Sequence, residues 1–255
     1  MNAIVLAAGM GTRLRPLTDD RPKSLVEIAG ESFFSRQLRL LAAAGIESVT
    51  VVTGYKAEAF GPWKNRRGLE FVHNDRFSDR NNIWSMYLVR ERLGDTVVLD
   101  GDLFLADGII PERPPEASGW YVGWRKDMRG EWVVRTDEAG RVRRIDVADG
   151  SGWTLTGLSY WTKEDGRLLA SLLGEAPAWP DWERLYWDEI PRRALDRMEA
   201  RAYRIDDEAW AEIDGLEDKI ELEARLASDG GPRTASNPNA PRLHDPELDS
   251  GRHGT

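Results

Sequence analysis

A short apolar stretch directly before a glycine-rich loop at the N-terminus limits the folds open to this chain. Residues Ala3 to Ala7 are all apolar, and Gly9 and Gly11 follow them. A run this short that ends in glycines predicts a buried strand that enters a loop. Helix-like segments (31–44, 83–93) then occur among strand-like ones (48–53, 69–73, 96–99). The order predicts an α/β fold with a mostly parallel sheet and helices on both of its faces.

The pattern changes after about residue 115. Short strand-like segments over 119–124, 132–136, 142–146 and 156–161, with turns at Gly130 and Gly140, precede helix-like segments over 163–173, 182–198 and 216–226. We therefore expect one domain over 1–227. Its parts are a core (1–115), a small mixed α+β lobe (116–200) and a return to the core with a closing helix (201–227). The polar, proline-rich segment 228–255 is predicted to be a disordered tail.

Composition excludes several classes of function. The chain has 255 residues and a formal net charge of -9, which argues against a general nucleic-acid binder because such proteins need a basic surface. It has no cysteine, so disulfides, thiolate metal sites and a catalytic cysteine are excluded. No stretch approaches the roughly 20 apolar residues of a membrane span. The N-terminus lacks signal-peptide features, so we expect a cytoplasmic protein. A monomer and a homodimer are equally compatible with the sequence.

The loop after the first predicted strand has the features of a phosphate-binding loop. Small residues allow the backbone to approach a triphosphate and to present several N–H groups to it. Arg13 can grip phosphate oxygens with its planar fork, and Lys23 adds a compact positive charge. The alternative is a plain glycine turn, and neither a Walker A motif nor GxGxxG occurs. The predicted nucleotide-binding residues here are Leu6, Ala7, Ala8, Gly9, Gly11, Thr12, Arg13 and Lys23.

The string LAAGMGTRLRPLT, followed by RPKSL, resembles the signature of the nucleoside-diphosphate-sugar pyrophosphorylase superfamily. The resemblance implies a Rossmann-like fold in which Arg13 and Lys23 hold the triphosphate, with Lys23 stabilising charge during attack at the α-phosphorus. It also implies a metal-binding aspartate at the end of the strand over 96–99, matched by Asp102, and a second one late in the chain, matched by Asp214. Mg²⁺ is the expected cofactor, and Asp100 is expected to assist at the nucleotide.

On residue type alone, the acidic turn Asp100-Gly101-Asp102 is compatible with two interpretations. Two carboxylates at a strand end can bind a hard cation through oxygen ligands. The alternative is a solvated acidic turn. Because the glycine loop and the acidic turn both follow strands, we expect both at the carboxyl edge of the sheet, where such folds bind ligands.

Four later segments narrow the family. NNIWSMYL, LTGLSYW, LYWDEI and EIDGLED occur in the order found in the bacterial CTP:phosphocholine cytidylyltransferases, which the chain resembles over most of residues 2–226. The resemblance places Asn82 and Ser85 where the base edge is read. Amides and hydroxyls can hydrogen-bond cytosine, although these residues are also suited to capping a helix.

The second lobe is rich in tryptophan. Proteins bind a quaternary ammonium on aromatic faces, because this cation has no N–H to donate. We expect Trp132, Tyr186 and Trp187, with Asp188 or Glu189, to form the acceptor-binding site. The alternative for any single tryptophan is a place in the core.

The resulting hypothesis is a cytidylyltransferase that transfers CMP from CTP to a small phosphorylated amine alcohol such as phosphocholine and releases pyrophosphate. Three alternatives remain: a cytidylyltransferase for 2-aminoethylphosphonate or another phosphonate, a sugar-1-phosphate nucleotidyltransferase, and a non-catalytic nucleotide-binding regulator. The expected partners are therefore CTP and a small phosphorylated or phosphonate acceptor, with no nucleic acid and no membrane.

Overall fold

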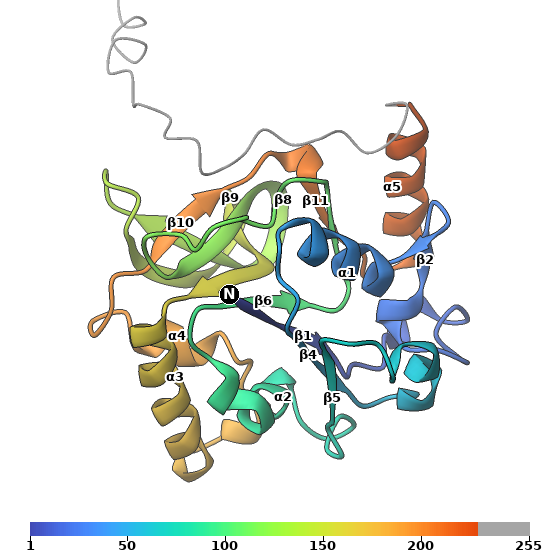
Figure 1. Ribbon diagram of the computed structural model, residues 1–255. Coiled ribbons are helices and arrows are strands. Elements are labelled where there is room, and N and C mark those ends of the chain that lie inside the picture. Colours follow the sequence, from blue (N-terminus) through green and yellow to red (C-terminus); the bar gives the residue numbers. More distant parts are fainter. Residues whose placement is uncertain (229–255) are drawn as a thin grey trace, which may run out of the picture.

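A computed structural model describes residues 1–228, so most of the predicted tail lies outside the described residues. The main sheet has seven strands in the order β10-β8-β9-β6-β1-β4-β5 (Figure 1). Its strands are β1 (Asn2–Ala7), β4 (Val49–Thr53), β5 (Leu69–His73), β6 (Thr96–Asp100), β8 (Gly119–Thr136), β9 (Val142–Trp161) and β10 (Arg201–Arg204). Two small antiparallel sheets join β2 (Glu27–Ile28) to β3 (Glu31–Ser32) and β7 (Leu103–Leu105) to β11 (Trp210–Glu212).

The helices cover both faces of this sheet. The α-helices within residues 1–228 are α1 (Phe33–Ala43), α2 (Asn82–Val89), α3 (Lys163–Glu175), α4 (Glu189–Arg193) and α5 (Leu216–Ser228). Of these, α5 packs beside β2 rather than on the main sheet. Short 3-10 helices lie at Thr12–Leu14, Lys23–Leu25, Ala57–Trp63, Arg90–Arg92, Ala176–Ala178, Trp182–Arg184 and Asp207–Ala209. Figure 1 shows α1 on one side of the sheet and α2 and α3 on the other. The predicted α/β class, with a mostly parallel sheet, is confirmed.

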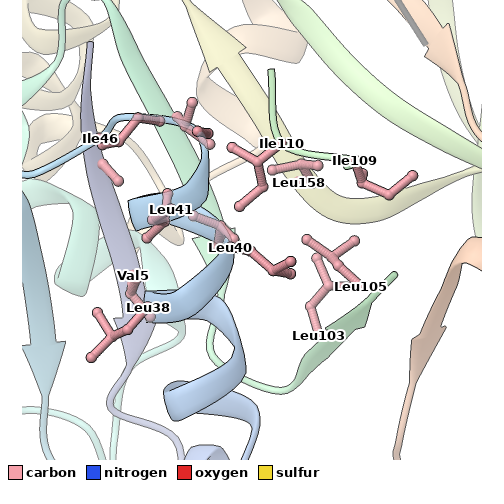
Figure 2. Packing of buried hydrophobic residues seen from close by; sticks show 14 of the residues in the cluster. Val5, Leu38, Leu40, Leu41, Ile46, Leu103, Leu105, Ile109, Ile110 and Leu158 are labelled. Carbon is pink, nitrogen blue, oxygen red and sulfur yellow. The ribbon is translucent and has the colours of Figure 1, made fainter. Parts of the chain in front are cut away.

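Alternation along β1 explains the two layers. Successive side chains of a strand point to opposite faces. Val5 therefore packs in the cluster that holds Leu38 and Leu41 of α1 (Figure 2), whereas Ile4 packs in the cluster that holds Met86 of α2 and Leu169 of α3. Because β1 is buried on both faces, it is apolar at successive positions rather than at alternate ones.

Parallel pairing places the strand ends together. Strand β1 pairs in parallel with both β4 and β6, so that Leu6 lies opposite Val52 on one side and Asp100 on the other. The carboxyl ends of all three strands thus meet at one edge of the sheet. The glycine loop and the acidic turn leave the sheet at this edge, as expected.

The tryptophan-rich lobe differs from the prediction in its connectivity. The predicted strands 119–124 and 132–136 belong to the single strand β8, and those over 142–146 and 156–161 belong to β9; register shifts interrupt the long hairpin. Strand β9 pairs antiparallel with β6, so the lobe extends the main sheet. The predicted helix over 182–198 is wrong: only α4 and a 3-10 turn form there. Pro191, which lacks a backbone N–H, is compatible only with the first turn of a helix, and α4 begins two residues before it.

Within residues 1–228, no helix is both long enough and apolar enough to cross a membrane.

Candidate functional site

A cleft of about 640 Å³ opens at the carboxyl ends of β1 and β6. The glycine loop, the acidic turn, the start of α2 and the β8–β9 hairpin all contribute to its walls. Most of the residues predicted from the sequence line it: Leu6, Ala7, Ala8, Gly9, Gly11, Thr12, Arg13, Lys23, Asn82, Ser85, Asp100, Asp102, Trp132, Tyr186 and Asp214. Trp187 and Glu189 are absent from its lining.

Two glycines allow the loops around this cleft to approach each other. Gly11 has a left-handed backbone (φ 58°), and a Cβ atom there would lie 2.8 Å from the Cβ of Lys23. At Gly101, a Cβ atom would lie 2.8 Å from the carbonyl oxygen of Leu6. Larger residues at these positions would force Lys23 or the acidic turn away from the end of β1.

Lys23 lies between the two predicted metal aspartates. Its Nζ is 2.6 Å from Oδ2 of Asp102 and 3.1 Å from Oδ1 of Asp214, and its side chain is only 12% exposed. Burial lowers the pKa of Lys23, but the charges and hydrogen bonds of the two carboxylates outweigh this effect and leave the pKa above its usual value. Arg13 donates from Nη2 to Oδ1 of Asp214 at 2.8 Å and is otherwise largely exposed.

An acidic triad forms beside this lysine. Carboxylate oxygens of Asp102, Glu212 and Asp214 lie within 4.8 Å of one another. Glu212 reaches the cluster because β11 pairs with β7, which sets Glu212 opposite Leu103. We had not selected Glu212 from the sequence, although it stands in the EIDGLED segment, two residues before Asp214. A group of three carboxylates is suited to a hard divalent cation, which takes oxygen ligands.

Burial and the charges of nearby carboxylates raise the pKa values of Glu212 and Asp100. Burial, together with the charges of Asp102 and Asp214, raises the pKa of Glu212 to about 7. Burial and the charge of Asp102 raise the pKa of Asp100 well above its usual value. Asp100 faces Gly157, where a Cβ atom would lie 2.8 Å from its Oδ2, and it is not a member of the triad.

The two predicted base-reading residues line the cleft at the start of α2, and neither caps the helix. Ser85 is buried and its Oγ accepts a hydrogen bond from Nδ2 of Asn74 at 2.9 Å. Asn82 accepts a hydrogen bond at Oδ1 from the backbone N–H of Trp187 at 2.8 Å. The N-cap residue of α2 is Asn81, and its side chain makes no capping bond. Asn74, which orients Ser85, was not anticipated from the sequence.

The predicted aromatic site is only partly assembled as expected. Trp132 and Tyr186 line the cleft, with ring centroids 6.5 Å apart and ring planes at 83°. Trp187 is buried at 2% exposure and packs edge-on against Trp161, so its ring belongs to the core. Glu189 binds Arg192 through Oε2 at 2.7 Å instead of lining the cleft.

Asp188 takes the place expected for Glu189. It lines the cleft, and its Oδ1 accepts a hydrogen bond from Nε1 of Trp120 at 2.8 Å. Burial raises the pKa of Asp188 to about 6, although the bond from Trp120 opposes the rise. At neutral pH this carboxyl group is therefore mostly ionised and faces the same cleft as Trp132 and Tyr186.

Comparison with known proteins agrees with this geometry. The family model of the MobA-like NTP transferase domain matches residues 3–109. The chain is 31% identical over 229 residues to choline-phosphate cytidylyltransferase of Streptococcus pneumoniae, a match that covers 90% of this chain and 100% of the relative. It is 30% identical over 218 residues to 2-aminoethylphosphonate cytidylyltransferase of Lancefieldella rimae, covering 84% of this chain and 89% of that protein.

A solved structure shows the same fold. The structure of CTP:phosphocholine cytidylyltransferase from Streptococcus pneumoniae matches with a TM-score of 0.84 at 31% identity, and the match covers 88% of this chain and 98% of that one. Members of the superfamily generally use a divalent metal, and the acidic triad supplies suitable ligands for one. Since the sequence identity extends over nearly the whole chain, this protein is a nucleotidyltransferase and belongs to the family of the choline-phosphate cytidylyltransferases.

Proposed function

We propose that this protein transfers CMP from CTP to phosphocholine, giving a CDP-linked product and pyrophosphate. The observation that carries the proposal is that one cleft is lined at one end by groups suited to phosphates and at the other by groups suited to an ammonium ion. Lys23 and the glycine loop form the first end. Trp132, Tyr186 and Asp188 form the second. Such a cleft accommodates an acceptor that has a phosphate at one end and a cation at the other.

At the phosphate end, the loop N–H groups, Arg13 and Lys23 are the groups that bind the triphosphate. Arg13 is 72% exposed, so its guanidinium can leave Asp214 and reach phosphate oxygens. Lys23 is held close to the reacting centre, where its charge stabilises the leaving pyrophosphate. The acceptor phosphate is largely ionised at neutral pH and needs no strong general base. Alignment in line with the α-phosphorus is then the main task of the cleft.

We assign the expected Mg²⁺ to Asp102, Glu212 and Asp214, whose oxygens are the ligand type that this ion prefers. When bound, the ion supplies Lewis-acid stabilisation of charge on the phosphates. Lys23 bridges Asp102 and Asp214 and thereby balances part of their negative charge.

At the ammonium end, Trp132 and Tyr186 meet edge to face and offer two roughly perpendicular aromatic surfaces. A trimethylammonium group binds such faces through cation–π attraction, and Asp188 adds a negative charge. Glu131 also lines the cleft. The carboxylates of Asp188 and Glu131 can also bind a primary ammonium group, so 2-aminoethylphosphonate is the second candidate acceptor.

The proposal is tested by pyrophosphate release from CTP and Mg²⁺ with purified protein. Phosphocholine, phosphoethanolamine, 2-aminoethylphosphonate and glucose-1-phosphate are offered in turn, with UTP and ATP replacing CTP as controls. We expect the highest kcat/KM with CTP and phosphocholine. A preference for 2-aminoethylphosphonate would select the second candidate. Release with UTP and the sugar phosphate would overturn the assignment, and CTP binding without release from any pair would favour a regulator.

A further inference from the structure

The start of α2 is joined to the segment that carries the ammonium-binding residues. Asn82 lies at the first position of α2 and lines the cleft. Its Oδ1 accepts the backbone N–H of Trp187 at 2.8 Å. Tyr186 and Asp188, which flank Trp187 in the chain, both line the cleft. A single asparagine side chain therefore lines the cleft and also binds the backbone of the segment that carries Tyr186 and Asp188.

Neighbouring contacts strengthen this junction. Nη1 of Arg80 lies 2.5 Å from Oε1 of Glu183, and the side-chain amide of Asn81 donates to the backbone carbonyl of Arg184. The Arg80 guanidinium also lies 5.3 Å from the ring centroid of Trp182. Residues 80–82 and 182–187 thus form one contact region, and Asn82 is the member of this region that we assign to the base of CTP.

The orientation of the Asn82 amide follows from its partner. Since the backbone N–H of Trp187 is a donor, the amide oxygen must face it, and the NH₂ group is left for another partner. Within residues 1–228, the Asn82 side chain makes no second hydrogen bond. The O2 and N3 atoms of cytosine are acceptors, so this NH₂ group is matched to either of them.

The Trp187 backbone is a favourable point at which to position the acceptor site. Its indole ring is fixed in the core against Trp161, with centroids 5.6 Å apart. The residues on either side project from this anchored backbone into the cleft. Restraining the Trp187 N–H therefore restrains the directions of Tyr186 and Asp188 together.

We propose that Asn82 is a positioning residue that links the two ends of the cleft: its amide nitrogen binds the base of CTP while its amide oxygen holds the backbone N–H of Trp187. Bound CTP then restrains the positions of Tyr186 and Asp188, which contact the acceptor. The link is reciprocal, because any factor by which one ligand raises the affinity for the other applies in both directions. The inference rests on the proposed function for its cytidine and acceptor ends.

This link is tested directly by backbone hydrogen exchange in segment 183–189. Exchange is measured by mass spectrometry on the full-length protein, with and without saturating CTP and Mg²⁺. No acceptor is added, so no transfer takes place. In the wild-type protein we expect CTP to slow exchange in this segment by about fivefold or more, the lower end of ordinary coupling between two sites. An unchanged exchange rate in the wild-type protein would overturn the proposal.

Two substitutions separate the two halves of the amide. Asn82→Asp keeps an acceptor oxygen for the Trp187 N–H but lacks the NH₂ donor, so exchange without CTP should equal that of the wild type and saturating CTP should no longer slow it. Asn82→Ala lacks both groups, so exchange should be faster without CTP and insensitive to it. Asn65→Ala changes an exposed asparagine away from the cleft and is the matched control, expected to behave as the wild type.

A response to CTP that persists in Asn82→Asp would overturn the role of the NH₂ group. Exchange in Asn82→Ala equal to that of the wild type would overturn the role of the oxygen. If Asn82→Ala fails to fold, as judged by circular dichroism, the nearly isosteric Asn82→Asp still tests whether the response to CTP needs the NH₂ group. This outcome does not depend on which acceptor the protein uses. If phosphocholine is not a substrate, the proposed acceptor is wrong, but the link between CTP and segment 183–189 is still tested by hydrogen exchange alone.

Discussion

Replacement of Asp188 by asparagine should make the protein more stable and a poorer enzyme. Burial raises the pKa of Asp188 to about 6 in the folded protein, from an ordinary value of 3.8. Because the folded-state value is the higher one, the stabilising contribution of this group is complete below about pH 4. It is lost as the pH rises through 6, where this partly buried carboxyl group becomes charged.

The size of the effect follows from this shift. A difference of about two pKa units at roughly 1.4 kcal/mol per unit amounts to about 3 kcal/mol by pH 7.5, and to about 1 kcal/mol at pH 4.5. The substituted side chain would carry no charge, and its amide oxygen can still accept the hydrogen bond from Trp120. We therefore expect Asp188→Asn to raise the free energy of unfolding by about 3 kcal/mol at pH 7.5 and about 1 kcal/mol at pH 4.5.

Urea unfolding followed by circular dichroism at the two pH values measures this difference. Steady-state kinetics at pH 7.5 measure its functional counterpart. Removal of the negative charge should raise the KM for phosphocholine by about tenfold or more, since a charge pair in a partly dry site contributes on the order of a few kcal/mol. The KM for CTP should stay unchanged. Asp196→Asn, at an exposed position, is the matched control.

Two results would refute this reasoning. A variant as stable as the wild type, or less stable, at pH 7.5 would show that the Asp188 charge is not held at a free-energy cost. A stabilised variant with an unchanged KM for phosphocholine would show that Asp188 takes no part in acceptor binding. In that case the ammonium group of the acceptor would have to be placed against Glu131 instead.

The remaining predictions concern the triad and the buried tryptophan. Glu212→Gln should raise the Mg²⁺ concentration that gives the half-maximal rate by about tenfold or more, because loss of a residue that only hydrogen-bonds a metal ligand already lowers metal affinity by about that factor. A Mg²⁺ titration unchanged from that of the wild type would remove Glu212 from the metal site. Trp187→Ala should lower the free energy of unfolding by about 3–5 kcal/mol, as expected for a large buried side chain. Trp132→Ala should instead raise the KM for phosphocholine and lower the free energy of unfolding, measured in urea, by less than Trp187→Ala does. A larger loss of stability in Trp132→Ala, or a larger rise of the KM in Trp187→Ala, would contradict our assignment of the two rings.

Local patterns along the chain were sufficient to predict the layers and one edge of the sheet. Strand β1 is apolar at successive positions, so its burial on both faces could be inferred before its neighbours were known. Parallel strands share their carboxyl edge, which brings the glycine loop and the acidic turn together without further information. The positions of Arg13, Lys23 and Asp102 in the cleft follow from this rule and from the family motifs.

Contacts between distant segments decided the rest. Glu212 joins the triad only because β11 pairs with β7, more than a hundred residues earlier in the chain. Trp187 and Asp188 are neighbours in sequence, but the ring of Trp187 turns to Trp161 in the core while the carboxylate of Asp188 reaches Trp120 and the cleft. Residue type and local spacing predicted the parallel core strands and the phosphate-binding loop of this protein, and the resemblance of its motifs indicated the family. Which side of an irregular segment faces the cleft depends on the packing of elements far apart in the chain, and only the tertiary structure contains that information.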